Sequence, residues 1–343
     1  MKLSVIIPTY NTPGKRLRRC MESIYSQDFN ALEVIVIDDG SGDQYKKDLI
    51  NMKLEYPFIL FQQNRRGVSA ARNLGIEKSC GEYLMFVDAD DTLEPDSLKR
   101  AIKLIHQYHA DIVLGGINII KGSEVKSCCI HQKAELICKK SDINSLQRYM
   151  LAIRCEKNND LWEDFRCTGP WAKIIKRDLI KDIRFDENLQ IYEDLMFNLQ
   201  MLDRTDCAII DPAVWYDYYI YSESSLHQYR ANGMEQMEYV AEKLEKFVTE
   251  HDEFKSASAV KIMECLKRLF TTTVFHDENA SRRKLSLVKN ILDNPYVDYL
   301  LNQFDEEKYS FTDKKERMLW IMFKKKYYIL VSVYYIIRSI CSE

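Results

Sequence analysis

Residues 83–91 read YLMFVDADD, an apolar run that ends in three carboxylates within four residues. Apolar runs of this length that are rich in β-forming residues predict a buried strand. Carboxylates placed so closely repel one another and lose solvation, so a cluster of this kind normally needs a cation. We expect Mg²⁺ or Mn²⁺ there, bridging the protein to a diphosphate.

Three earlier segments repeat this arrangement of an apolar run followed by polar residues. The runs lie at residues 3–7, 34–37 and 58–61, and the polar clusters after all four runs lie at residues 8–11, 38–41, 63–64 and 88–91. Between the runs, apolar side chains such as Leu17, Met21 and Ile24 recur at helical spacing. This alternation predicts an α/β fold with a Rossmann-like, mostly parallel central sheet. Ligands bind beyond the carboxyl ends of such strands, so we expect the four polar clusters on one rim.

Composition narrows the class of protein further. With 343 residues the chain is long enough for about two domains. Its 49 basic and 52 acidic residues nearly cancel, so no nucleic-acid partner is expected. The ten cysteines are irregularly spaced, and the sequence begins directly with an apolar run instead of a secretory signal. We therefore expect reduced thiols, no structural zinc and a cytoplasmic location.

The middle of the chain shows a weaker pattern. A strand is expected at residues 111–114, uncertain strands at 128–137 and a tyrosine-rich extended stretch at 215–221. Residues 193–202 have leucines on one helical face, which places Glu193 and Asp194 in the first turn of a helix. Amides at a helix start can hold and orient carboxylates. Beyond Gly233 nearly every segment predicts helix.

One C-terminal segment has features of a membrane-surface helix, expected within residues 313–340. Lysines at 324–326 precede an uncharged, tyrosine-rich run at 327–337, which Arg338 ends. This run is much shorter than the ~20 residues that span a bilayer. Its composition suits an in-plane helix on an anionic leaflet, peripheral to the inner face of a cell membrane. A terminal helix packed on its own domain remains the alternative.

Five motifs in register resemble those of family 2 glycosyltransferases of the A-type (GT-A) fold. They are SVIIPTYN (4–11), VIDDGS (36–41), NRRGVSAARN (64–73), DADD (88–91) and the pair Glu193-Asp194. The close resemblance covers about residues 1–110, with scattered support up to residue 221. It implies a nucleotide-sugar-binding half at 1–110, an acceptor-binding half at 111–225 and a helical C-terminal domain at 226–343.

The resemblance assigns residues to the nucleotide. A uracil ring offers an N3–H donor between two carbonyl acceptors, and Asp38 resembles the family's carboxylate for that donor. Arg72 and Asn64 are candidate donors to the base or its linkage. The other nucleotide-binding candidates are Pro8, Thr9, Tyr10, Asn11 and Asp88. Alternatively, Asp38 is a turn residue and Arg72 a solvated helix charge.

The resemblance also assigns the acidic residues. Asp90 is the expected direct ligand of Mn²⁺ or Mg²⁺, and Asp88 reaches the metal or the ribose. Asp91 contacts the donor sugar or caps the following helix. Asp194 resembles the catalytic base that takes the acceptor's proton, while Glu193 binds hydroxyls or orients its neighbour. The alternative for Asp194 is a helix-terminal charge without a catalytic role.

Two clusters resemble acceptor-side elements. Trp171 and Lys173 form a Trp-x-Lys element similar to that of capsule and wall-polymer members, although a buried Trp171 with a solvated Lys173 is the alternative. The tyrosine-rich segment 218–225 resembles one that ends in a serine, here Ser225. Relatives often carry an arginine within that segment to hold the diphosphate. The nearest arginine here is Arg230, which leaves that contact in doubt.

Taken together, the resemblance implies an inverting, metal-dependent transferase that moves a hexosyl or N-acetylhexosaminyl group from a UDP-sugar. The acceptor would be a hydroxyl of a glycan or lipid-linked molecule in bacterial cell-surface polysaccharide synthesis. An inactive binding module is the first alternative, but the retained Asp88, Asp90 and Asp194 argue against it. A sugar nucleotidyltransferase is the second, and the single glycine in residues 9–16 supports it poorly. The sequence leaves a homodimer open.

Overall fold

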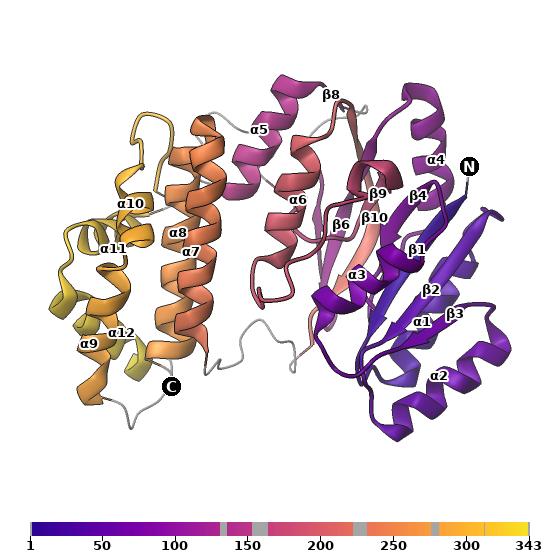
Figure 1. The fold of residues 1–343 in the computed structure, drawn as a ribbon, viewed down its shortest axis with the longest axis horizontal. Helices are drawn as coiled ribbons and strands as arrows, with labels where there is room; N and C mark the ends of the chain where they lie inside the picture. Colours follow the sequence, from indigo (N-terminus) through magenta and orange to yellow (C-terminus); the bar gives the residue numbers. More distant parts are fainter. Residues whose placement is uncertain are drawn as a thin grey trace. The chain divides into compact units, whose positions relative to one another are not determined.

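The computed structural model describes residues 2–130, 136–152, 164–221, 232–275, 281–311 and 313–341. The chain forms two compact units, one of Met1–Leu146 with Asp160–Ser222 and one of Gln147–Asn159 with Glu223–Glu343. Figure 1 shows the strands of the first unit and the helices of the second. The chain thus has the α/β fold and the helical C-terminal region that the sequence predicts.

The first unit is built on one mixed sheet with the strand order β3-β2-β1-β4-β9-β6-β10-β5, in which β7 pairs with β6 and β8 with β10. Its strands are β1 (Leu3–Thr9), β2 (Leu32–Asp38), β3 (Ile59–Gln62), β4 (Tyr83–Phe86), β5 (Thr92–Leu93), β6 (Ile112–Lys121), β7 (Glu124–Cys128), β8 (Leu136–Cys138), β9 (Lys173–Lys176) and β10 (Ala208–Tyr219). The four N-terminal strands are parallel neighbours, as predicted. Strand β9 runs antiparallel to both β4 and β6.

Helices cover both faces of the parallel half of the sheet. The helices of this unit are α1 (Gly14–Tyr25), α2 (Asp43–Glu55), α3 (Val68–Lys78), α4 (Ser97–Tyr108) and α6 (Glu193–Asp203), with a 3₁₀ turn η2 (Arg177–Ile180); α5 (Lys140–Leu151) crosses from one unit to the other. Val34 and Val36 pack in the same core as α1 and α4, whereas Ile35 and Ile37 pack against Ala71 of α3. Alternate residues of β2 are thus buried on opposite faces of the sheet. Because both faces are covered, the strand is a continuous apolar run in the sequence.

The later strands differ from their predicted bounds. Strand β6 extends seven residues past 114 because its far end pairs with β7 and β10. Strand β10 begins at Ala208, seven residues before the predicted start at 215. Pro212 hides this continuity in the sequence, but the pairing register shifts between Ile210 and Val214. A bulge accommodates a proline that would otherwise break the ladder.

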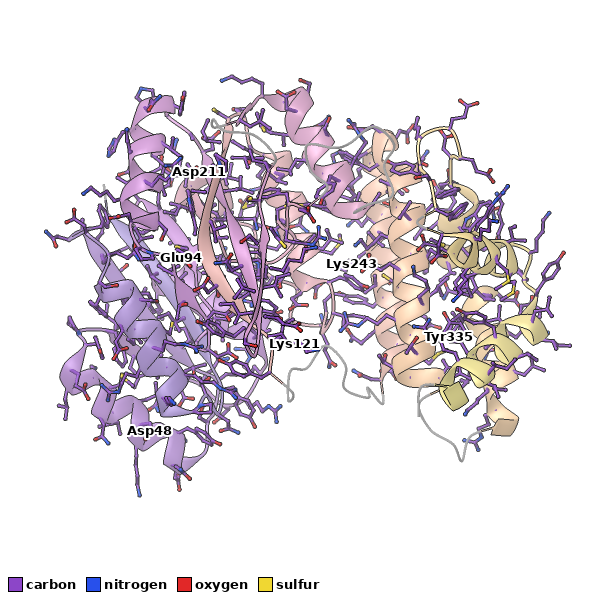
Figure 2. The ribbon with its side chains drawn as sticks, turned by 180° about the vertical axis from the view of Figure 1, so that it is seen from behind. Asp48, Glu94, Lys121, Asp211, Lys243 and Tyr335 are labelled. Atoms are coloured by element: carbon purple, nitrogen blue, oxygen red, sulfur yellow. The ribbon has the colours of Figure 1, made fainter. Side chains whose placement is uncertain are left out.

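The second unit is helical. Its elements are α7 (Gly233–Glu250), a 3₁₀ turn η4 (Asp252–Phe254), α8 (Lys255–Leu269), a π-helical turn η5 (Phe270–Val274), α9 (Ser281–Leu292), α10 (Pro295–Asn302), α11 (Lys314–Lys324) and α12 (Tyr328–Cys341). Tyr335, labelled in Figure 2, is 1% exposed and packs on the rings of Phe270 and Phe275. This aromatic cluster forms part of the core of the second unit.

The single C-terminal helix expected within residues 313–340 is in fact two helices. Helix α11 ends where Lys326 adopts φ 55°, and Tyr327 N donates to Met322 O at 2.9 Å. Together with the Lys326 N to Phe323 O bond of 3.1 Å, this is a Schellman motif with lysine in the left-handed position. Among the described residues, no helix combines the length and hydrophobicity needed to cross a bilayer.

Candidate active site

The carboxyl ends of the first strands meet at one edge of the sheet. Thr9 lies opposite Asp38, and Asp38 lies opposite Gln62, in the parallel ladders. Asp38 is fully buried, and its carboxylate accepts hydrogen bonds from Ser41 N at 2.9 Å and from Gln62 Nε2 at 3.1 Å. Asn11 Oδ1 accepts from Gly42 N at 2.9 Å, which ties the loop after β1 to the loop after β2. This edge of the sheet is therefore held together by side chains from adjacent strands and the loops that follow them.

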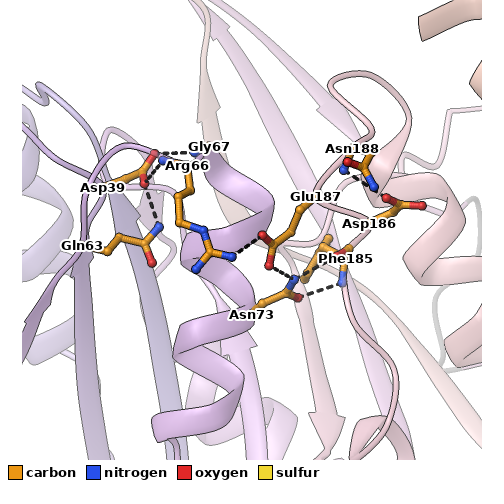
Figure 3. A network of polar contacts seen from close by, with 9 residues as sticks. All are labelled: Asp39, Gln63, Arg66, Gly67, Asn73, Phe185, Asp186, Glu187 and Asn188. Atoms are coloured by element: carbon orange, nitrogen blue, oxygen red, sulfur yellow. Dashed lines mark hydrogen bonds and ion pairs between the residues drawn. The ribbon is translucent and has the colours of Figure 1, made fainter.

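Asp39, which the sequence motif did not single out, holds the loop after β3. Its carboxylate accepts from Gln63 Nε2 at 2.7 Å and from the backbone amides of Arg66 and Gly67 at 2.8 Å, as Figure 3 shows. The loops after β2 and β3 touch closely at Gly40, which has φ 78°. A Cβ at this position would lie only 2.7 Å from Arg65 N. Only glycine fits there without strain.

The same loop carries a second feature that the sequence did not reveal. The Arg65 guanidinium lies 4.2 Å above the ring of Tyr10, which is 39% exposed. Asn64 is also exposed at this loop. No sequence motif indicates this cation–π contact, because it joins loops that follow different strands. Tyr10 and Asn64 are thus exposed at this edge of the sheet, whereas Asp38 is buried there.

Arg72 on α3 joins the two acidic motifs. Its side chain is 4% exposed and contacts Asp194 Oδ1 at 2.7 Å, Asp88 Oδ1 at 3.1 Å and Glu193 Oε1 at 3.8 Å. The alternative of a solvated helix charge is therefore wrong. Because its ion-pair partners come from both motifs, the arginine lies between the acidic cluster after β4 and the pair at the start of α6.

Helix α6 is held against α3 by the loop that precedes it, seen in Figure 3. Asn73 Nδ2 donates to Phe185 O at 2.9 Å, and Phe185 N donates to Asn73 Oδ1 at 2.8 Å. Arg66 pairs with Glu187 at 2.7 Å. These bonds hold the segment that leads into α6, and Glu193 and Asp194 lie in the first turn of that helix, as predicted.

Electrostatics at Asp194 are dominated by burial. Desolvation raises the pKa of Asp194 to about 8, and the negative charges of Glu193 and Asp88 add to this effect. The Arg72 charge acts in the opposite direction and lowers that pKa, as does Lys173 more weakly. In its ionised form a carboxylate with such a raised pKa accepts a proton efficiently, so this pKa suits general-base chemistry.

The three aspartates after β4 have different surroundings. Asp88 and Asp90 are partly exposed, but Asp91 is 1% exposed. The Asp91 carboxylate accepts from the Tyr216 hydroxyl at 2.7 Å and from Tyr219 N at 2.9 Å. It does not cap α4, whose N-cap residue is Asp96. Asp91 therefore lies beneath the site and anchors β10, and its surroundings do not favour the predicted donor-sugar contact.

Asp88 and Asp90 fit a divalent cation that is shared with a substrate. Within the described ranges, no group of three or more His, Cys, Asp or Glu side chains could hold a metal ion. Burial and the Asp88 charge raise the pKa of Asp90, which a neighbouring cation would reverse. Mg²⁺ and similar ions often take only one or two protein carboxylates and complete their shell with water and substrate phosphates. Two carboxylates are sufficient for a site of this kind.

The Trp-x-Lys element has the opposite exposure to the alternative considered above. Trp171 is half-buried and stacks on Tyr216 and Tyr218, with ring centroids 5.3 and 5.4 Å apart. Lys173 is 1% exposed, and its Nζ donates to the carbonyl oxygens of Gly169 and Trp171. Burial lowers the pKa of Lys173 to about 8. Ser225, the third acceptor-side candidate, lies outside the described residues.

Comparison with known proteins finds a family whose model matches the N-terminal part of the chain. Residues 4–158 match the model of Glycosyl transferase family 2. This part of the chain therefore carries a family 2 glycosyltransferase domain, as the resemblance of its motifs indicates. GlyA of Streptococcus pneumoniae is described as a glycosyltransferase and is 31% identical over 189 residues, which are 54% of this chain and 26% of GlyA. YibD of Escherichia coli, described as an uncharacterized glycosyltransferase, is 48% identical over 112 residues, which are 32% of each chain. The chain thus spans about a third or less of the length of these two relatives.

Solved structures agree on the fold. The crystal structure of TarS 1–349 from S. aureus in complex with UDP-GlcNAc matches with a TM-score of 0.67 and 21% identity, over 98% of this chain and 91% of that chain. At this identity the likeness shows the GT-A fold and no more. The predicted fold class is confirmed.

Proposed function

We propose that the chain is an inverting, metal-dependent glycosyltransferase that moves a sugar from a UDP-sugar to a hydroxyl of a glycan or lipid-linked acceptor. Arg72 carries the proposal, because it contacts Asp88 and Asp194 at once and so joins a metal-type carboxylate to a base-type carboxylate. The family 2 glycosyltransferase domain supports transferase chemistry. TarS, described as a poly(ribitol-phosphate) N-acetylglucosaminyltransferase, supports a role in surface-polymer synthesis.

The donor would bind at the strand-end edge. Tyr10 and Asn64, which are exposed, and the neighbouring Pro8, Thr9 and Asn11 would border the nucleotide. Asp38 already accepts two hydrogen bonds from the protein beneath this edge, so its role toward uracil stays a prediction. The TarS complex with UDP-GlcNAc supports a UDP-sugar donor.

Inversion needs a base on the side of the sugar opposite the departing diphosphate. Asp194 would take the acceptor's proton as the new glycosidic bond forms. Arg72 would favour the ionised form of that carboxylate by lowering its pKa and would orient it, and Glu193 would bind sugar hydroxyls. Asp88 and Asp90 would hold Mn²⁺ or Mg²⁺, which when bound neutralises charge on the leaving diphosphate. The partial exposure of both side chains after β4, in contrast to the buried Asp91, supports this placement of the cation.

The proposal is tested by UDP release. Purified protein with Mn²⁺ and a panel of UDP-sugars should release UDP, and the Asp194→Asn variant should not. Adding lipid-linked acceptors should increase UDP release from one of the UDP-sugars more than from the others. If no donor gives release, with or without such acceptors, the chain is a binding module and the proposal is wrong.

We further propose that the second unit contacts the inner face of an anionic cell membrane. Apolar side chains on one stripe of α12 are exposed, namely Ile329, Leu330, Val333, Ile336 and Ile337. Lys325 and Arg338 at the two ends of this helix are exposed as well. An apolar stripe flanked by cations is the pattern of an interfacial helix. Lys326 contributes less, because it pairs with Asp298 at 3.0 Å.

A further inference from the structure

Two arginines of α1 stack on two tyrosines at the end of β10. The Arg16 guanidinium lies 3.5 Å from the centroid of the Tyr221 ring, and the Arg19 guanidinium lies 3.6 Å from that of Tyr219. The two tyrosine rings are themselves stacked, with centroids 6.3 Å apart. These contacts join segments about 200 residues apart, and the motifs of the sequence indicate neither arginine.

This arginine pair lies beside the carboxylate assigned to the metal. Arg19 Nη2 donates to Asp90 O at 2.7 Å and to the Tyr221 hydroxyl at 2.8 Å. The charges of Arg16 and Arg19 both lower the pKa of Asp90 against the effect of burial. The buried Asp91 carboxylate accepts a hydrogen bond from the backbone amide of Tyr219. This bond holds Tyr219 at the place where its ring contacts Arg19. The pair is therefore fixed in place next to Asp90.

Two other cations near the acidic residues, both in the described part of the chain, are buried. Arg72 is buried against three carboxylates, and Lys173 is buried against two carbonyl oxygens. Arg16 and Arg19 also have partners, but their side chains are partly exposed. Stacking on a ring holds a guanidinium by its face and leaves N–H groups along its edge for an anion. Arg19 Nε is buried and has no acceptor among the residues that the structure describes.

We propose that Arg16 and Arg19 form a diphosphate-binding site for the UDP-sugar, next to the cation at Asp88 and Asp90. The inference rests on the proposed function and adds two residues to its donor site. In the reaction, the acceptor oxygen bonds to the anomeric carbon, and its proton goes to Asp194. The anomeric C–O bond breaks and leaves its electron pair on the diphosphate. The leaving UDP thus carries more negative charge than the intact donor, and guanidinium groups beside it stabilise that additional charge.

The test compares UDP with uridine, both in the presence of Mn²⁺. UDP binding is measured by calorimetry and uridine binding by ligand-observed NMR. The test variant is the double substitution Arg16→Gln with Arg19→Gln. Arg18→Gln is the matched control, because Arg18 lies on the same helix but pairs with Glu55, with Nη2 to Oε1 at 2.7 Å.

We expect the double variant to lose at least about tenfold in UDP affinity, with uridine affinity unchanged within about twofold. The control should bind both ligands as the wild type does. Unchanged UDP affinity in the double variant would overturn the inference while leaving the proposed function intact. Equal loss of UDP and uridine would also overturn it, because the pair would then only support the fold. If the wild type itself does not prefer UDP over uridine, the proposed function fails first.

Discussion

Arg72 Nη1 lies 2.7 Å from Asp194 Oδ1, in a position where the arginine is almost fully buried. This contact brings a side chain of α3 to the first turn of α6 and sets the charge of the proposed base. Removal of the arginine would leave several carboxylates without their buried cation, which is strongly destabilising in general. The pair therefore couples the fold to the proposed chemistry.

The first prediction concerns pH. A base works in its ionised form, so kcat/KM should rise as the pH increases through about 8, the raised pKa of Asp194, and level off above it. Because Arg72 lowers that pKa, Arg72→Gln should move the rising limb to higher pH. The measurement is the pH profile of UDP release. A limb at the same pH in both proteins would show that Asp194 is not the titrating base.

The second prediction separates catalysis from binding at Asp194. Asp194→Asn keeps the shape of the side chain but removes its basicity. We expect transfer to fall by about 10²-fold or more, with UDP affinity within a few-fold of the wild type. Calorimetry and a UDP-release assay measure the two quantities. Equal losses of binding and transfer would make Asp194 a structural residue instead of the base.

The third prediction distinguishes two neighbouring aspartates. Asp90→Asn should weaken UDP binding in Mn²⁺ but have little effect in EDTA, because Asp90 is the proposed metal ligand. Asp91→Asn should leave the Mn²⁺ dependence intact. It should instead lower the free energy of unfolding by about 1–3 kcal/mol, because asparagine has one acceptor oxygen and cannot keep both the Tyr216 and the Tyr219 hydrogen bonds.

Urea denaturation measures the free energy of unfolding of both variants, and calorimetry measures their UDP binding. The two substitutions make the same chemical change at adjacent positions, so each is the control for the other. An Asp90→Asn variant whose UDP binding responds to Mn²⁺ as strongly as the wild type would place the metal elsewhere.

The fourth prediction concerns the exposed stripe of α12. Leu330→Glu with Ile337→Glu should reduce sedimentation with vesicles that contain anionic lipid, because charge replaces side chains 53% and 57% exposed. Leu54→Glu is the control, since Leu54 is 84% exposed on α2 in the other unit. Unchanged sedimentation of the double variant would refute membrane contact. A shift from dimer to monomer in the same variant would instead assign the stripe to a second copy.

Much of the fold follows from local patterns. The four N-terminal strands and the start of α6 were predictable because apolar periodicity and turn residues act within a few neighbouring positions. Strand β10 was placed less well, since Pro212 looks like a strand breaker until the bulge at Asp211–Ala213 is seen. The split between α11 and α12 was missed because a left-handed lysine, not a glycine, ends α11.

The amino-acid sequence alone determined which carboxylates lie at strand ends and that those ends share one edge, because parallel pairing of consecutive strands leaves little choice. The tertiary structure alone decided the partners of the charged side chains. Arg72 could have faced solvent. Lys173 is buried, although a solvated lysine was the alternative. Arg19 reaches Asp90 and Tyr221 from a helix without a recognised motif. Such contacts depend on how helices and strands far apart in the chain pack together, and no short-range pattern encodes that packing.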